Sequence, residues 1–150
     1  MKKSNNIEIV EVKEESPEIL TTLQNLLPQL TSSFKSFEMS DLKEIVDSKI
    51  VHLYIAIDRL STDQIVGTYT SVIFRIPTGN TIRIEDVIVD ENRRGEGIGK
   101  KMIQHAVDIA KSAGVNKIEL TTHEWRIEAN KLYQSLGFTK IDTNVYRYKT

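Results

Sequence analysis

The segment between residues 81 and 113 changes its periodicity once, at a loop with three glycines. Before the loop, "TIRIEDVIVD" is rich in β-branched residues and predicts a strand. After it, apolar residues recur at helical spacing until Gly114, which stands where a glycine commonly ends a helix. The loop itself, "NRRGEGIG", has no side chain at Gly95, Gly97 and Gly99. Because bare backbone amides then precede a helix, the segment predicts an anion-binding site.

The regions on either side complete a mixed α/β prediction. Ser16 and Pro17 open a first helix that we expect Pro28 to stop, and a capping pattern opens a second helix at Ser40. Short turns separate the strands before the loop, so these should be antiparallel, with one parallel crossover through the helix that follows. The predicted strands are 7–12, 50–58, 64–74, 81–90 and 117–122, then a closing hairpin of 138–142 with 144–149; the last helix is 128–135.

Bulk properties indicate a single domain, residues 1–150, in a cytoplasmic protein. The 20 basic and 21 acidic residues nearly cancel and are scattered, which argues against nucleic-acid binding. No apolar run is long enough to span a membrane, and the first residues lack the apolar core of a signal peptide. The absence of cysteine excludes disulfides and a cysteine nucleophile. The three histidines have no i+4 pairing, so no metal site is predicted.

The glycine loop does not fit the two common nucleotide motifs. The dinucleotide fingerprint requires a third glycine where this chain has Lys100. The P-loop requires four residues between its glycines and a hydroxyl residue where this chain has Lys101. Viewed alone, the loop is also compatible with an ordinary turn before a helix.

Two longer motifs resemble the GNAT superfamily of N-acetyltransferases. Arg94 to Gly99 matches its R-x-x-G-x-G pyrophosphate loop, within "IEDVIVDENRRGEGIGKKMIQHA". Further on, "EANKLYQSLGF" is similar to its N-x-x-Y signature. The resemblance covers essentially the whole chain. Within the superfamily, the run "RIPTG…IEDVIVDE…NVYRY" resembles small bacterial acetyltransferases that act on small amines. It implies the GNAT (acyl-CoA N-acyltransferase) fold, an α/β domain with a mixed, mostly antiparallel sheet of six to seven strands and about four helices.

The resemblance also implies acetyl-CoA as the donor and assigns residues to hold it. Backbone amides of the glycine loop would bind the pyrophosphate, and backbone groups of the preceding strand would bind the pantetheine arm. An amide of Ile88 or Val89 would polarise the thioester carbonyl. The residues expected to contact the donor are Val87, Ile88, Val89, Arg94, Gly95, Glu96, Gly97, Ile98, Gly99 and Asn130.

Tyr133 and Glu85 are the expected catalytic residues. By resemblance, Tyr133 protonates the departing thiolate, which its phenol can do chemically; the alternative is a tyrosine that packs under the last helix. Glu85 and Asp86 are adjacent and should point to opposite faces of their strand, so one should face the cleft. Glu85 is preferred as a base acting through water; the alternative is a surface carboxylate.

Four aromatic residues are candidates for acceptor contacts: Phe34, His123, Trp125 and Tyr146. His123 is a second candidate base or a solvated loop residue. Tyr146 shares a predicted strand face with Tyr148, and this closing strand is a candidate homodimer contact. Core packing is the alternative for Phe34.

The predicted function is transfer of acetyl from acetyl-CoA to a primary amine of a small molecule in a ternary complex. One alternative is acetylation of proteins or peptides, which requires an open groove, whereas residues 28–40 suggest a lid. Another is a non-catalytic domain that senses acyl-CoA. The sequence predicts neither nucleic-acid nor membrane partners.

Overall fold

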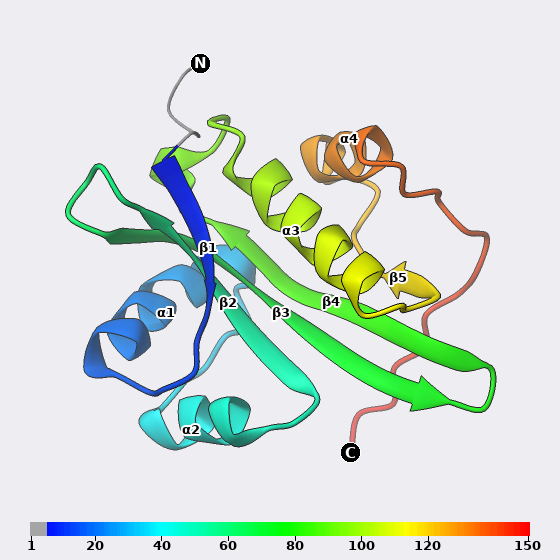
Figure 1. Ribbon diagram of the computed structural model, residues 1–150, viewed down its shortest axis with the longest axis horizontal. Helices are drawn as coiled ribbons and strands as arrows, with labels where there is room; N and C mark the ends of the chain where they lie inside the picture. Colours follow the sequence, from blue (N-terminus) through cyan, green and yellow to red (C-terminus); the bar gives the residue numbers. More distant parts are fainter. Residues whose placement is uncertain (1–5) are drawn as a thin grey trace.

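The computed structural model describes residues 6–150 and is built around a five-stranded mixed sheet (Figure 1). The strands lie in the order β1-β2-β3-β4-β5, and every neighbouring pair is antiparallel except β4 and β5. The strands are β1 (Ile7–Glu11), β2 (Val51–Asp58), β3 (Gln64–Ile76), β4 (Gly79–Val89) and β5 (Lys117–Glu119). The helices are α1 (Pro17–Leu30), α2 (Met39–Asp47), α3 (Ile98–Ser112) and α4 (Ile127–Ser135), with a 3-10 turn at Glu91–Arg93.

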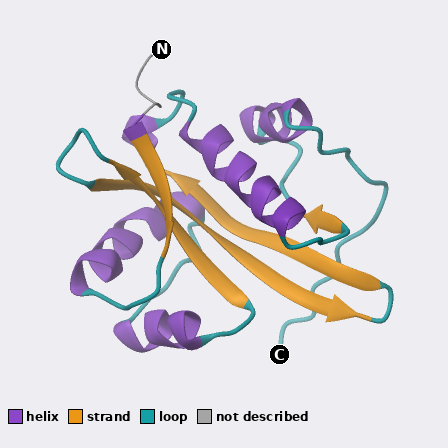
Figure 2. Cartoon of the chain, in the orientation of Figure 1, coloured by secondary structure: helices purple, strands orange, loops and turns teal. Residues whose placement is uncertain are grey.

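Helices cover both faces of the sheet (Figure 2). Alternation along β2 shows how one strand serves both layers. Leu53, Ile55 and Ile57 join the apolar cluster under α1 and α2, whereas Tyr54 and Ala56 join the cluster under α3. Each aliphatic side chain buried in this way stabilises the fold by about 1.5–3 kcal/mol.

Strand β4 contains a bulge at Asp86, which adopts a left-handed backbone conformation with φ of 50°. The register with β3 shifts there, because Thr70 lies opposite Glu85 and Thr68 lies opposite Ile88. Two residues of β4 therefore oppose one residue of β3, as in a β-bulge.

The bulge changes which residues of β4 face α3. Ile82 and Ile84 belong to the cluster under α3, and so do Val87 and Val89 beyond the bulge. Uninterrupted alternation would have placed the valines on the opposite face from the isoleucines. The premise that Glu85 and Asp86 must point to opposite faces therefore does not hold at this point of the strand.

Several predicted elements differ in the structure, among them β3 and β4, which extend further toward their shared turn than predicted. Helix α1 continues past Pro28 to Leu30, although Pro28 has no N–H to donate within the helix. Strand β5 is shorter than predicted. The closing hairpin is wrong: residues 138–150 form neither helix nor strand, and β5 offers only a very short edge for pairing.

The described sheet therefore has five strands rather than six to seven. Tyr146 and Tyr148 lie in the segment without regular structure and are 89% and 91% exposed. The dimer contact through this segment stays a prediction. No helix within residues 6–150 is long and apolar enough to cross a membrane.

Candidate functional site

The parallel strands β4 and β5 separate before β4 ends. Their pairing is confined to Thr81–Arg83 and Lys117–Glu119, whereas β4 continues to Val89. The edge of β4 from Ile84 to Val89 consequently has no partner strand on this side within the described chain. We call the region where this edge and residues 120–126, which follow β5, are no longer paired the wedge. An unpaired edge of this kind can bind an extended ligand through backbone hydrogen bonds.

Hydrogen bonds at the end of β4 show which amide faces the wedge. The Asp90 N–H donates to the Val66 carbonyl at 2.9 Å, so it points toward β3. Because amides of an extended strand alternate between its two edges, the N–H of Val89 points toward the wedge. The Val89 carbonyl lies on the same edge, where it accepts from Nε of Arg94 at 3.2 Å. Of the two predicted amides, that of Val89 therefore faces the wedge and that of Ile88 faces β3.

The glycine loop follows β4 in the sequence and ends at the N-terminus of α3. Gly97 is the N-cap residue and has φ of 81°, a left-handed conformation that favours glycine. The first hydrogen bond of α3 runs from Lys101 N–H to the Gly97 carbonyl at 3.1 Å. The N–H groups of Ile98, Gly99 and Lys100 thus have no acceptor within the helix. Such orphan amides, together with the helix dipole, attract an anion.

Arg93 fastens the glycine loop to the end of β2. Its Nη2 lies 2.8 Å from Oδ2 of Asp58, and its Nε donates to Oε2 of Glu96 at 3.0 Å. The Asp58 side chain is only 8% exposed. The hydrogen bond from Arg93, with a further one from the Leu60 amide, lowers the pKa of Asp58. Since Glu96 turns its carboxylate toward Arg93, its contribution to an anion site is its backbone amide.

Sequence reasoning missed Arg93 and Asp58. Arg93 stands beside the predicted Arg94, but nothing local distinguishes the arginine that fixes the loop from the one that remains exposed. The partner Asp58 is 35 residues away in the sequence.

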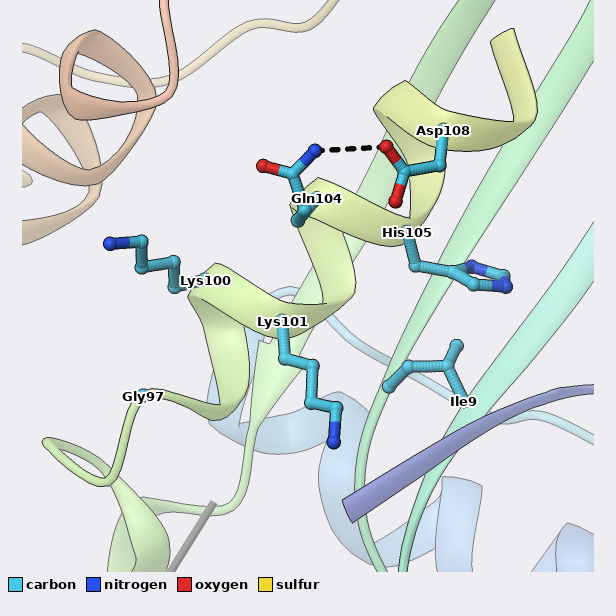
Figure 3. A pocket seen from close by; sticks show the side chains of 7 residues that line it. All are labelled: Ile9, Gly97, Lys100, Lys101, Gln104, His105 and Asp108. Carbon is cyan, nitrogen blue, oxygen red and sulfur yellow. Dashed lines mark hydrogen bonds between the residues drawn. The ribbon is translucent and has the colours of Figure 1, made fainter. Parts of the chain in front are cut away.

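A hollow of about 460 Å³ lies between the start of α3 and β1 (Figure 3). Lys101 and His105 extend toward Ile9 of β1, whereas Lys100 points away on the other side of the helix. His105 Nδ1 is 2.7 Å from the hydroxyl of Tyr69, and burial lowers the pKa of His105. The hollow also includes Gly97. Lys101 therefore brings one ammonium group into this hollow at the start of α3.

Tyr133 lies on α4, the helix beside the glycine loop. A Cβ added at Gly99 would lie 3.4 Å from Leu132 of α4 and 3.7 Å from Val89, which shows how closely the three elements approach. The Tyr133 ring is half-buried, with the Phe138 ring centroid 6.0 Å away. Burial raises the pKa of Tyr133, and the charge of Arg126 opposes this rise. The phenol therefore keeps its proton near neutral pH and can donate it.

Glu85 and Asp86 differ in their surroundings. Oε1 of Glu85 accepts from Nε of Arg83 at 2.7 Å, so this carboxylate already has a cationic partner. The side chain of Asp86 is accessible to solvent, yet the protein atoms around it and the charge of Glu85 raise its pKa. A raised pKa suits a carboxylate that has to accept a proton near neutral pH.

The predicted acceptor residues are not all brought together. His123 and Trp125 stack in the loop after β5, with ring centroids 5.5 Å apart and an interplanar angle of 13°. Asn130 donates from Nδ2 to the carbonyls of His123 and Arg126, each at 2.9 Å, so it organises this loop. Phe34 is half-buried in the loop between α1 and α2. Tyr146 lies in the C-terminal segment without regular structure and is 89% exposed, and its contact with an acceptor stays a prediction.

The chain belongs to the acetyltransferase (GNAT) family, whose model matches residues 20–138. This match confirms the predicted family. Its fold is confirmed by solved structures: an aminoglycoside acetyltransferase from an uncultured soil metagenomic sample, in complex with sisomicin, has a TM-score of 0.84 at 20% identity over 99% of both chains. Glucosamine-6-phosphate N-acetyltransferase from Arabidopsis thaliana has a TM-score of 0.78 at 23% identity, over 95% of this chain and 97% of the other.

Curated relatives resemble part of the chain. Thialysine N-epsilon-acetyltransferase of Sus scrofa is 37% identical over 60 residues, which are 40% of this chain and 35% of that protein. Mycothiol acetyltransferase of Renibacterium salmoninarum is 29% identical over 116 residues, 73% of this chain and 34% of that protein. The matches thus span about a third of these relatives' length. Within residues 6–150, no three side chains of His, Cys, Asp or Glu are grouped so that they could hold a metal ion.

Proposed function

We propose that this protein transfers the acetyl group of acetyl-CoA directly to a primary amine of a small molecule. The observation that carries the proposal is the meeting of the wedge with the glycine loop at Val89. One end of the unpaired β4 edge is joined by residues 90–97 to the free amides that begin α3. An elongated ligand with a diphosphate at one end fits this combination of a strand edge and an anion site.

Acetyl-CoA supplies an activated thioester. The amides of residues 94–99 bind its diphosphate, and the edge of β4 binds the pantetheine arm. Val87 and Ile88 contribute mainly by packing, whereas the Val89 N–H donates to the thioester carbonyl and stabilises the negative charge that develops there. This assignment follows from the direction of the Val89 amide.

The reaction forms a C–N bond and breaks the C–S bond. The attacking amine must first lose a proton, because an alkylamine is cationic near neutral pH. The carboxylates of Glu85 and Asp86 attract that cation. Because Glu85 already pairs with Arg83, and the protein atoms around Asp86 raise its pKa, Asp86 is the proton acceptor in this proposal and acts through water. Tyr133 donates its proton to the departing sulfur. Direct transfer agrees with a chain that has no cysteine to form an acyl intermediate.

The proposal is tested by titrating the purified protein with acetyl-CoA in a calorimeter, followed by an amine panel read by thiol release. We expect micromolar binding and turnover of at least one small amine. The absence of cysteine leaves no background thiol from the protein. Turnover of peptides alone would support the peptide alternative. Binding without any turnover would support an acyl-CoA sensor.

A further inference from the structure

The last turn of α1 contacts both sides of the wedge. On one side, Oε1 of Gln29 accepts from the backbone N–H of Glu91, which follows β4, at 2.9 Å. On the other side, the carbonyl of Leu30 accepts from Nη2 of Arg126 at 3.0 Å. Arg126 and Leu30 are 96 residues apart in sequence. Helix α1 therefore bridges the two diverging edges, and the loop of residues 31–38 starts at this bridge.

An arginine is well suited to this end of α1. The last carbonyls of a helix accept no hydrogen bond from the helix itself. The helix dipole makes this end negative, which favours a cation. The last turn of α1 contains no basic residue of its own. Arg126 supplies the missing cation, and a hydrogen bond from a charged donor is stronger than a neutral one.

The backbone of Arg126 is fixed at the start of α4. Its N–H donates to the His123 carbonyl at 3.1 Å, and its own carbonyl accepts from both the backbone and the side chain of Asn130. The position of Arg126 is therefore linked to the helix that carries Tyr133. A shift of the Arg126 side chain would alter the distance between α1 and α4.

From these contacts we propose that Arg126 is a positioning residue for the acceptor. It ties α1 to α4 across the wedge, and so sets the opening through which the amine reaches the site and the place of Tyr133 beside it. The inference deepens the proposed function and rests on it. Because the tie lies on the acceptor side, donor binding through the glycine loop does not depend on it.

The chain has a single tryptophan, and it reports on this tie directly. The Cζ atom of Arg126 lies 5.1 Å from the centre of the Trp125 ring, close enough for a cation–π contact. Removing the guanidinium changes the surroundings of Trp125, and so its fluorescence emission. A second reporter is Lys35, an exposed trypsin site in the loop that starts at the bridge.

The experiment compares wild type with Arg126→Ala, Arg126→Lys and the control Arg75→Ala, which removes an exposed arginine at the far end of β3. For Arg126→Ala we expect a shifted Trp125 emission and cleavage after Lys35 about ten-fold faster, because the bridge opens locally. KM for the amine should rise and kcat fall, each by about five- to ten-fold, while the acetyl-CoA Kd stays within about two-fold. Arg126→Lys keeps the positive charge but lacks the planar guanidinium, so both effects should be smaller than in Arg126→Ala.

Unchanged cleavage after Lys35 together with unchanged amine kinetics would overturn the inference. An equal loss of acetyl-CoA affinity would also overturn it, since that would indicate a general loss of structure. If the wild type acetylates no amine, the proposed function fails; emission and proteolysis then still decide whether Arg126 holds α1 to α4.

Discussion

The two sides of the wedge are held in place by different means. On the donor side, the Asp58–Arg93–Glu96 ion-pair network fixes the glycine loop, and α3 behind it buries Ile98, Met102 and Ile103 almost completely. On the acceptor side, the hydrogen bond from Arg126 to the Leu30 carbonyl joins the loop of residues 120–126 to the end of α1, and Trp125 is 70% exposed. The donor side is therefore backed by ion pairs and by fully buried side chains. The acceptor side carries few contacts, so it can be altered without cost to the core.

The largest effect should come from breaking the donor side at Gly97. Gly97→Val places a β-branched side chain at φ of 81° and beside the free amides, so acetyl-CoA affinity should fall by about 30-fold or more. The matched control is Gly114→Val, where φ is 64° and a new Cβ meets nothing within 4 Å. Both variants carry backbone strain, but only the first should lose binding in calorimetry. Equal binding in the two variants would remove the glycine loop from the donor site.

Tyr133→Phe separates chemistry from donor binding. We expect kcat to fall about 100-fold, because the departing sulfur loses its proton donor, with the acetyl-CoA Kd unchanged within about two-fold. Tyr148→Phe, at a solvated tyrosine, is the control and should behave as wild type. Single-turnover thiol release measures the effect, and a kcat within about two-fold of wild type would show that water protonates the sulfur.

Asp86→Asn and Glu85→Gln distinguish the two carboxylates. The pKa of Asp86 is raised, and a base acts only when deprotonated, so kcat/KM of wild type should fall as pH drops through that raised pKa. Asp86→Asn should lower kcat/KM about ten-fold near neutral pH. It should also remove the fall of kcat/KM at low pH, which is the acid limb of the pH profile. Glu85→Gln should keep the limb. A limb that disappears only in Glu85→Gln would restore the base predicted from sequence.

The smallest effect should appear in acid stability. Arg93 lowers the pKa of Asp58 in the folded protein, so its ion pair stabilises the fold above the pKa of the unfolded chain and ceases to do so as pH falls through the folded pKa. Asp58→Asn should lower Tm by about 3 °C near pH 7 and by less near pH 3. Asp63→Asn, in an exposed pair with Arg59, is the control and should change Tm little. A Tm difference that does not depend on pH would refute this role.

Local signals predicted the donor side well and the acceptor side poorly. The strand, the glycine loop and α3 are contiguous, so periodicity and turn chemistry place them from the sequence. The pairing of Arg93 with Asp58 and of Arg126 with Leu30 joins distant segments, and no local pattern encodes it. Alternation predicted a closing hairpin after Phe138, but alternation alone does not supply the partner strand that a hairpin edge needs.

The bulge at Asp86 changes which residues of β4 face α3. Before it, even-numbered residues of β4 face α3; after it, odd-numbered residues do. Deleting Asp86 would leave an unbroken alternation in which Ile84, Val87 and Val89 still face α3. The same extra residue bends the strand just beyond its last pairing with β5. The bulge therefore changes the course of β4 while Val87 and Val89 keep their packing against the cluster under α3.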